Sequence, residues 1–195
     1  MNITLVRHGA CRENIEKRFI GVTDSPLDLE GAKQALALAQ KLGEVDHIYV
    51  SPLARCRQTM VLVWPRTDFT VVDDLRETDF GPFEGKTHEE LKDDDLYNKW
   101  IWEPDDPSIV PLVEDVVSCG LRATKALTFI VKDSRGKGFE NIAIVSHGGT
   151  IMGMMARHGL PKHSYYSWRM DNCGGFIITV EGENDELSLR LVDKF

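Results

Sequence analysis

The sequence predicts an α/β fold, a three-layer sandwich in which helices cover both faces of a mostly parallel sheet. Short apolar runs typical of buried strands alternate with longer segments of helical periodicity along the chain. This alternation favours parallel strands that are connected by helices packed on the two faces. The 195 residues, 42% of them hydrophobic, are enough to bury one large core, so we expect a single domain over residues 1–195.

The first third of the chain predicts two strands and two helices. Residues 3–6 (ITLV) and 47–50 (HIYV) are short apolar runs of buried-strand type. Residues 28–43 begin with an aspartate that can cap a helix, continue with Ala and Leu, and end with a glycine. A second helix should begin near Leu53 and end before Pro65, because proline cannot continue a helix.

The middle of the chain predicts a strand, an irregular segment and a long helix. Residues 68–73 (DFTVVD) are of strand type. Residues 78–110 are acidic and aromatic, although the THEE spacing at Thr87 is typical of a capping box on a short helix. Apolar residues then keep helical spacing over 113–131, with Gly120 as a weak point.

The last quarter predicts three more strands and one helix. IAIV (142–145) is a buried-strand run, and residues 150–159 follow it as a helix. Residues 176–182 and 187–192 are two late strands, joined by a turn at 182–186.

Composition excludes several classes of protein. The formal charge of −8 argues against a nucleic-acid partner, which would require a basic surface. No apolar run approaches 18 residues, and no basic start precedes an apolar stretch, so we expect neither a membrane span nor a signal peptide. The four cysteines form no C-x-x-C pair, which suits a reducing cytoplasm. No histidine spacing is typical of a metal site, so we expect no metal and no other cofactor.

One phrase occurs twice in the chain. NITLVRHGA begins at Asn2 and NIAIVSHGG begins at Asn141, and each is an apolar run followed by a polar residue and His-Gly. Ligands of α/β sheets bind beyond the carboxyl ends of the strands. If the two strands are neighbours, His8 and His147 face each other across a crevice. The glycine after each histidine lets the backbone approach a ligand, which makes Gly148 a candidate binding residue.

Five ordered blocks, LVRHGACREN, RFIGVTDSPLDLEG, SPLARCRQT, LRETDFGPFEG and VSHGGTI, resemble the histidine phosphatase superfamily, which includes the cofactor-dependent phosphoglycerate mutases. The resemblance spans most of the chain and implies a phosphoglycerate mutase-like fold and a phosphohistidine mechanism. It also implies roles for seven site residues: His8 as nucleophile, Arg7, Arg55 and His147 as ligands of the phosphoryl oxygens, Glu77 on the leaving-group proton, and Asn14 with the Gly21 backbone in the phosphate pocket.

These residue types suit phosphoryl transfer on chemical grounds as well. The transferred group spreads negative charge over its oxygens, so catalysis is mostly positioning and positive charge. Arg7 and Arg55 offer planar forks that match phosphate, and they disfavour protonation of His8. An alkoxide leaving group needs a carboxylic acid nearby, and Glu77 has apolar neighbours that favour the protonated form. Asp79 and Glu84 compete with Glu77 by position, and the family block selects Glu77.

Other polar residues have ordinary structural interpretations. The acid run at 93–95 is expected to be a solvated helix end. Cys11 stands where the family usually has a hydroxyl residue; a thiol beside Arg7 could be prone to oxidation, but a buried, inert cysteine is favoured. Four histidines match no block and are interpreted as surface or core polar groups: His47, His88, His158 and His163.

Three functions stay open, of which a small-molecule phosphatase is favoured. The chain has no P-loop, and no cysteine is followed six positions later by arginine, as a cysteine phosphatase requires. A phosphoglycerate mutase is the alternative, and a binding-only regulator is the third possibility. Residues 78–110 are expected to form a lid over the site, and this lid has three lysines, no arginine and many acids, which disfavours a doubly anionic sugar acid. Its aromatic residues instead offer a stacking surface for an apolar leaving group, namely Phe80, Phe83, Tyr97, Trp100 and Trp102.

The LRETDFGPFEG block looks most like the α-ribazole phosphatase-like branch of this superfamily. Those relatives usually carry Gly-Glu-Ser before the long helix, where this chain has PSIVPLVEDV. The departure concerns the substrate pocket and leaves the phosphate pocket unaffected. The expected ligands are a small-molecule phosphate ester and inorganic phosphate. The sequence leaves the physiological substrate and the oligomeric state open.

Overall fold

The computed structural model describes residues 1–102, 112–182 and 186–195, and it contains one seven-stranded sheet in the order β3-β2-β4-β1-β6-β7-β5. Every described neighbouring pair is parallel except those made by β6, so the sheet is mostly parallel, as predicted. The strands are β1 (Asn2–Arg7), β2 (His47–Val50), β3 (Phe69–Val71), β4 (Asn141–Ser146), β5 (Gly159–Leu160), β6 (Gly175–Glu181) and β7 (Ser188–Lys194).

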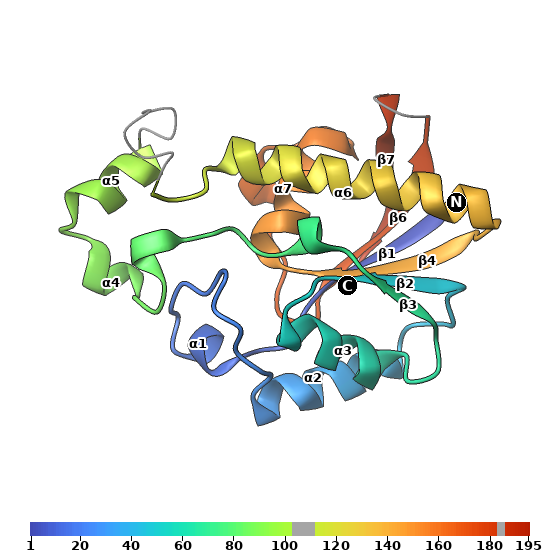
Figure 1. Cartoon of the computed structure of the whole chain (residues 1–195), viewed down its shortest axis with the longest axis horizontal. Coiled ribbons are helices and arrows are strands. Elements are labelled where there is room, and N and C mark those ends of the chain that lie inside the picture. The colour runs from blue at the N-terminus through green and yellow to red at the C-terminus, as the bar shows by residue number, and fades with distance from the viewer. Residues whose placement is uncertain (103–111, 183–185) are drawn as a thin grey trace.

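The helices form layers on the two faces of this sheet, with α6 and α7 on one side and α2 and α3 on the other (Figure 1). This arrangement confirms the three-layer α/β sandwich. The α-helices are α1 (Arg12–Ile15), α2 (Leu29–Ala39), α3 (Ala54–Val63), α4 (His88–Leu91), α5 (Asp95–Trp102), α6 (Val116–Lys137) and α7 (Gly148–His158). Among the described residues, α1, α5 and β5 are elements that the sequence did not predict.

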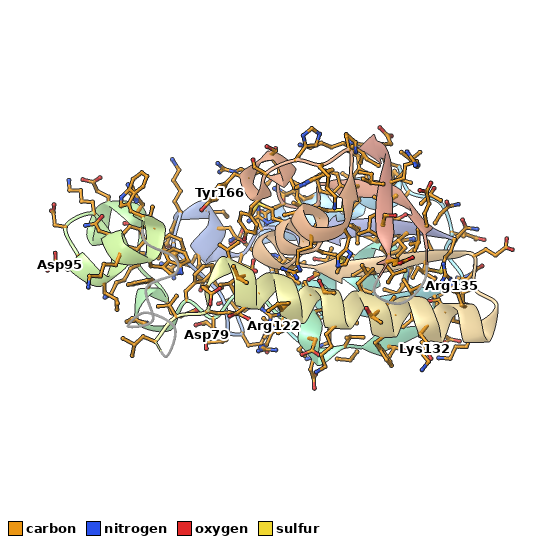
Figure 2. All side chains as sticks on the ribbon, turned by 90° about the horizontal axis from the view of Figure 1, so that it is seen from above. Asp79, Asp95, Arg122, Lys132, Arg135 and Tyr166 are labelled. Carbon is orange, nitrogen blue, oxygen red and sulfur yellow. The ribbon has the colours of Figure 1, made fainter. Side chains whose placement is uncertain are left out.

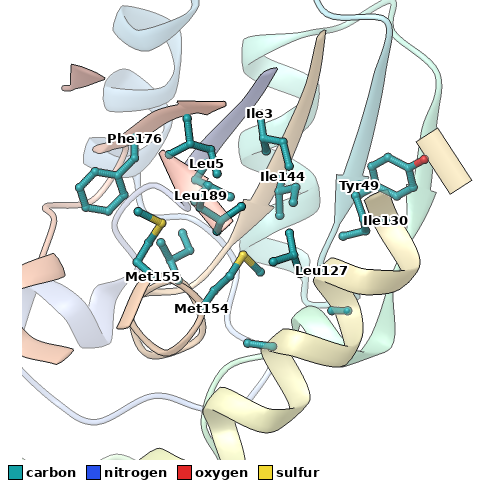
Figure 3. Close-up of a cluster of buried hydrophobic side chains, with 14 of the residues drawn as sticks. Ile3, Leu5, Tyr49, Leu127, Ile130, Ile144, Met154, Met155, Phe176 and Leu189 are labelled. Atoms are coloured by element: carbon teal, nitrogen blue, oxygen red, sulfur yellow. The ribbon is translucent and has the colours of Figure 1, made fainter. Parts of the chain in front are cut away.

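The alternation of side chains along the strands builds a separate core on each face. Ile3 and Leu5 of β1 point to the same face as Ile142 and Ile144 of β4 and pack there with residues of α6 and α7 (Figure 3). The intervening residues of both strands face the cluster under α2 and α3. Because these two strands are buried on both faces, they read as continuous apolar runs.

The long helix α6 begins later than its apolar pattern suggests. Asp115 caps it by accepting a hydrogen bond from the Ser118 amide (2.8 Å), so Val113 lies outside the helix. Gly120, predicted to be a weak point, lies where α6 meets α7. A Cβ on Gly153 of α7 would lie 3.1 Å from the Cα of Gly120. The absence of side chains at both positions permits this close helix contact.

Apolar residues of 78–102 form a small hydrophobic cluster together with Phe19 and Val113. Phe83 and Tyr97 are 1% and 2% exposed and pack with Leu91 and Val113, while Phe80 and Trp100 lie against this cluster. The predicted stacking surface is therefore wrong for Phe83 and Tyr97, which are buried within this cluster, whereas Trp102 is exposed. Thr87 does cap α4 through the predicted capping box. Residues 103–110 of the expected lid lie outside the described residues.

Candidate active site

The two copies of the repeated phrase lie side by side. Strands β1 and β4 pair in parallel from Asn2 with Asn141 to Arg7 with Ser146, so the histidine after each strand emerges at the same sheet edge. The rings of His8 and His147 are 5.0 Å apart, centre to centre, and meet edge to face at 62°. The two imidazoles that the sequence predicted to face each other do so.

The ring of His8 is held in one orientation and one tautomer. Its Nδ1 lies 2.7 Å from the Gly9 carbonyl oxygen, which can only accept, so Nδ1 carries the proton and Nε2 keeps its lone pair. The side chain is buried, and burial together with the charges of Arg55 and Arg7 lowers the pKa of His8 well below its usual value. His8 is therefore neutral near pH 7, and Nε2 is a competent nucleophile.

His147 begins α7 as its N-cap and is completely buried. Its Nε2 lies 2.7 Å from Ser51 Oγ at the end of β2 and 3.3 Å from the Sγ of Cys56. Burial, followed by the charge of His8 and the arginines, lowers the pKa of His147 well below its usual value. A second neutral imidazole thus lies beside the first.

Two arginines enter the same space with unused hydrogen-bond donors. Arg55 is fully buried on α3, where its two terminal nitrogens donate to the carbonyls of Thr23 (2.8 Å) and Gly21 (2.7 Å). Arg7 donates to the Met170 carbonyl (2.9 Å). The Nε atoms of both guanidinium groups are buried and have no hydrogen-bond partner in this structure. A buried, unpartnered N–H is costly, so this pair is arranged for an anion.

Glu77 lies against the N-terminus of α7. Its carboxylate accepts hydrogen bonds from the amides of Thr78 (2.9 Å), Gly149 (3.1 Å) and Thr150 (3.2 Å). A Cβ on Gly149 would lie 2.6 Å from Glu77 Oε1, so only glycine allows this approach. The carboxylate also acts electrostatically on Arg7. Glu77 is thereby fixed beside the arginine-lined space, held by polar donors and not by the apolar neighbours expected from the sequence.

Asn14 and Gly21 have different surroundings. The side-chain oxygen of Asn14 accepts from the Cys11 amide (3.1 Å) and from Asn172 Nδ2 (3.3 Å), and Asn14 lines the open pocket. The amide of Gly21 donates to Glu84 (2.8 Å), and its carbonyl accepts from Arg55. In this structure the Gly21 backbone therefore orients Arg55, and its amide is already occupied.

A pocket of about 650 Å³ opens above these groups. Arg7, Glu77 and Gly148 are among its lining residues, whereas His8, Arg55 and His147 are buried and do not line it. No described residue of 78–102 lines this pocket. Residues 78–110 as a lid therefore stay a prediction.

The charge around the pocket corrects one sequence-based argument. The lid segment was expected to leave the site without cations, yet Lys17, Arg18 and Arg169 line the pocket from other parts of the chain. Among the described residues that line the pocket, cations therefore outnumber acids.

Sequence reasoning missed residues that hold the others in place. Asn172 donates to the His8 carbonyl (3.0 Å) as well as to Asn14. Arg122 forms a buried pair with Glu114 (2.7 Å) and donates to the carbonyls of Arg76 (2.7 Å) and Glu77 (3.3 Å). An arginine on the apolar side of a predicted helix was the available signal for Arg122, whereas Asn172 follows no recognisable pattern.

The residues that the sequence analysis interpreted as structural do have structural contacts. Cys11 is buried, and burial raises the pKa of its thiol to about 11, so it is inert. Asp94 accepts from the Tyr97 amide at the start of α5, which confirms a helix end in the acid run. Three of the four remaining histidines make structural hydrogen bonds, namely His47 to Thr70, His88 to Tyr97 and His158 to Leu187, and His163 packs on Trp168. No metal-binding group of His, Cys, Asp or Glu occurs within the described ranges.

The mostly parallel sheet brings two neutral imidazoles together at its carboxyl edge, beside two arginines whose Nε atoms have no partner. This arrangement is typical of an enzyme that transfers or hydrolyses phosphoryl groups. The family model of the histidine phosphatase superfamily (branch 1) matches residues 3–192, and the chain belongs to this superfamily.

Individual relatives agree with this membership. The chain is 29% identical over 178 residues to an adenosylcobalamin/α-ribazole phosphatase of Escherichia coli, covering 88% of this chain and 86% of that protein. It is 27% identical to a probable phosphoglycerate mutase of Yersinia pestis, covering 100% and 98%. The solved structure of a phosphoserine phosphatase from Entamoeba histolytica, in complex with 3-phosphoglyceric acid, matches with a TM-score of 0.80 and 25% identity over 99% of this chain and 95% of that one. The protein is an enzyme that hydrolyses phosphate esters of small molecules.

Proposed function

We propose that the hydrolysis proceeds in two steps through a phosphohistidine on Nε2 of His8. One observation carries this proposal: His8 has its Nδ1 proton fixed on the Gly9 carbonyl, which leaves the Nε2 lone pair unused beside two arginines whose Nε atoms have no partner. Arg7 and Arg55 bind the phosphoryl oxygens together with the Asn14 side chain and the amide end of α7 at Gly148.

In the first step, Nε2 attacks phosphorus and the bond between phosphorus and the ester oxygen breaks. Glu77, in its protonated form, gives its proton to the departing oxygen, so that a neutral alcohol leaves. His147 donates to a phosphoryl oxygen from Nδ1. Its Nε2 lies against the Ser51 hydroxyl, which itself accepts from the Leu53 amide (3.4 Å) and so points its proton at the ring.

In the second step, water replaces the alcohol. The Glu77 carboxylate takes a proton from the water as its oxygen attacks phosphorus, and the bond from phosphorus to Nε2 breaks with its electrons returning to the ring. Inorganic phosphate leaves, and both His8 and Glu77 regain their starting protonation states. One carboxyl group thus serves both steps.

A phosphoglycerate mutase is the second candidate, favoured by the relative named as one and by the cations around the pocket. A mutase must return the phosphoryl group to the same intermediate before water reaches it. The two reactions are separated by assaying phosphate release and interconversion of 3- and 2-phosphoglycerate on one preparation. We expect phosphate release to be faster for the better ester substrates. Interconversion that exceeds release, with a bisphosphoglycerate as activator, would assign the mutase.

The phosphohistidine is tested by rapid acid-free quenching with a ³²P-labelled ester. Wild-type protein should acquire alkali-stable, acid-labile label, and His8→Ala should acquire none while losing activity by several orders of magnitude. His163→Ala is the matched control, because that histidine is exposed and packs on Trp168, away from the described pocket. Hydrolysis without label, or unchanged activity in His8→Ala, would contradict the mechanism. Binding of phosphate with neither label nor turnover would indicate a binding-only regulator.

We also propose that the enzyme works without a metal, in the cytoplasm and without a nucleic-acid partner. Two arginines and two imidazoles supply the positive charge and donors that a divalent ion provides elsewhere. The formal net charge of −8 and the free, buried cysteines support the other two proposals. No helix of the described residues is long and apolar enough to cross a membrane.

A further inference from the structure

We propose that Lys17 and Arg169 form a second anion subsite at the mouth of the pocket, which selects phosphate esters whose alcohol part carries a carboxylate or another anionic group. The inference rests on the proposed function, because it assigns the substrate class of that same site. It concerns the leaving-group side of the pocket, beyond the arginines that hold the phosphoryl group.

The first observation is that some cations of the site are buried and others are exposed. Arg7 and Arg55 are buried at the phosphoryl position, whereas Lys17 and Arg169 are exposed on the rim of the same pocket. Arg169 is near enough to Arg7 for its charge to lower the pKa of that guanidinium. A charge on the rim therefore acts on a group at the phosphoryl site.

The second observation is that these two cations have no anionic partner. Within the described part of the chain, neither the Lys17 side chain nor the Arg169 side chain forms an ion pair or hydrogen bond, whereas Arg18, which also lines the pocket, pairs with Glu16 and Glu90. Among the described residues that line the pocket, the acids are Glu77 and Asp171, and Asp171 acts on Arg7. Lys17 and Arg169 are the lining cations that keep no anionic partner within the described ranges.

A third observation concerns the backbone of Lys17. Its φ of +58° lies in the left-handed region, which glycine or asparagine adopts with less strain than lysine. Lysine nevertheless occupies this strained position on the pocket rim. A cation at this point is consistent with a function in the pocket and is not required by the turn.

The chemistry of the subsite follows from this placement. An ester bound with its phosphoryl group on Arg7 and Arg55 directs its alcohol part outward, toward Lys17 and Arg169. An anionic group there gains two charge-assisted contacts, while a neutral alcohol leaves the rim cations to solvent. The substrate class is therefore a small phosphomonoester with a second anionic group, in place of the apolar leaving group expected from the sequence.

The test compares two esters that share a carbon skeleton, 3-phosphoglycerate with its carboxylate and glycerol 3-phosphate with a hydroxymethyl group in its place. Dissociation constants are measured by calorimetry in a His8→Ala background, where turnover is blocked. We expect tighter binding of 3-phosphoglycerate. Lys17→Met and Arg169→Met should each reduce that preference by about two- to fivefold, which is the change in affinity expected when one exposed ion pair is removed. The double variant should reduce the preference by about tenfold. Glycerol 3-phosphate should bind all variants within about twofold.

Lys132→Met is the matched control, because Lys132 is an exposed cation toward the far end of α6 from the pocket residue Tyr166 (Figure 2). It should leave the preference unchanged. An equal preference in wild type and in the double variant would overturn the subsite, even if phosphate release and the phosphohistidine are observed. Conversely, loss of the preference in the double variant supports the subsite even if no hydrolysis occurs, so the two proposals fail separately.

Discussion

The two buried imidazoles predict a loss of stability between pH 7.5 and 5.5. His8 and His147 are completely buried, and burial with nearby positive charge lowers both pKa values well below 6.5. In the unfolded chain both rings titrate near pH 6.5. The unfolded state therefore binds protons in this window that the folded state does not bind. The stability is fully present above pH 6.5 and is lost as the pH falls toward the folded-state pKa values.

The magnitude follows from linkage. A ring that stays neutral in the folded protein, with an unfolded pKa of 6.5, costs about 1.4 kcal/mol of unfolding free energy between pH 7.5 and 5.5. Two rings cost about 2.7 kcal/mol, a large fraction of the roughly 5–15 kcal/mol that holds a domain together. Carboxyl groups with lowered pKa values, such as Asp46 and Asp133, lose their contribution only at lower pH.

The assay is urea unfolding at pH 7.5 and 5.5, at constant ionic strength and in a buffer free of phosphate. His8→Asn keeps an amide at the position of Nδ1 to donate to Gly9, and His147→Gln keeps one at the position of Nε2 beside Ser51. The double variant should lose about 2.7 kcal/mol of the pH dependence, while His47 and His158, whose pKa values are also lowered, continue to contribute. A double variant with the full wild-type pH dependence would refute the assignment of two buried, neutral rings.

Three further predictions concern the same site. Glu77→Gln should slow alkyl phosphates at least a hundredfold and aryl phosphates far less, because an aryloxide departs without a proton; equal effects in the two ester series would remove Glu77 from proton transfer. Activity should persist in excess EDTA and be inhibited by vanadate, whereas loss on chelation with recovery in a divalent ion would contradict metal independence. Arg122→Met should destabilise the protein by about 3–5 kcal/mol in urea, because it removes the charge that pairs with the largely buried Glu114, while the double variant Arg122→Met/Glu114→Leu recovers part of that loss; equal destabilisation in both would exclude the pair as the cause.

The elements that the sequence predicted correctly are those whose signal is local. The repeated phrase predicted β1 and β4 because strands that are buried on both faces are apolar throughout. The two strands pair in parallel, and corresponding residues of the two phrases lie opposite each other. Asp28 predicted the start of α2, and its side chain does accept the Glu30 amide there. The helix nevertheless ends at Ala39, several residues before the glycine at 43 that was expected to stop it.

The parts that the sequence did not predict depend on contacts between distant segments. The aromatic residues of 78–102 show no helical periodicity in the sequence, because they pack around one another and around Phe19 instead of along one helix face. The occupied amide of Gly21 depends on Glu84, which is 63 positions away. The cations on the pocket rim come from a turn after α1 and from the segment before β6, so no local pattern could show that they share a pocket.

The same features that suit the site to phosphate weaken the folded protein without it. Two buried Nε–H groups have no partner, and two imidazoles are held neutral against positive charge. A bound phosphate dianion would accept from both Nε atoms and would offset the charge that disfavours protonation of His8 and His147. The enzyme's stability and its affinity for phosphate are two consequences of one arrangement of charge, in which the strongest donors are buried before the ligand arrives.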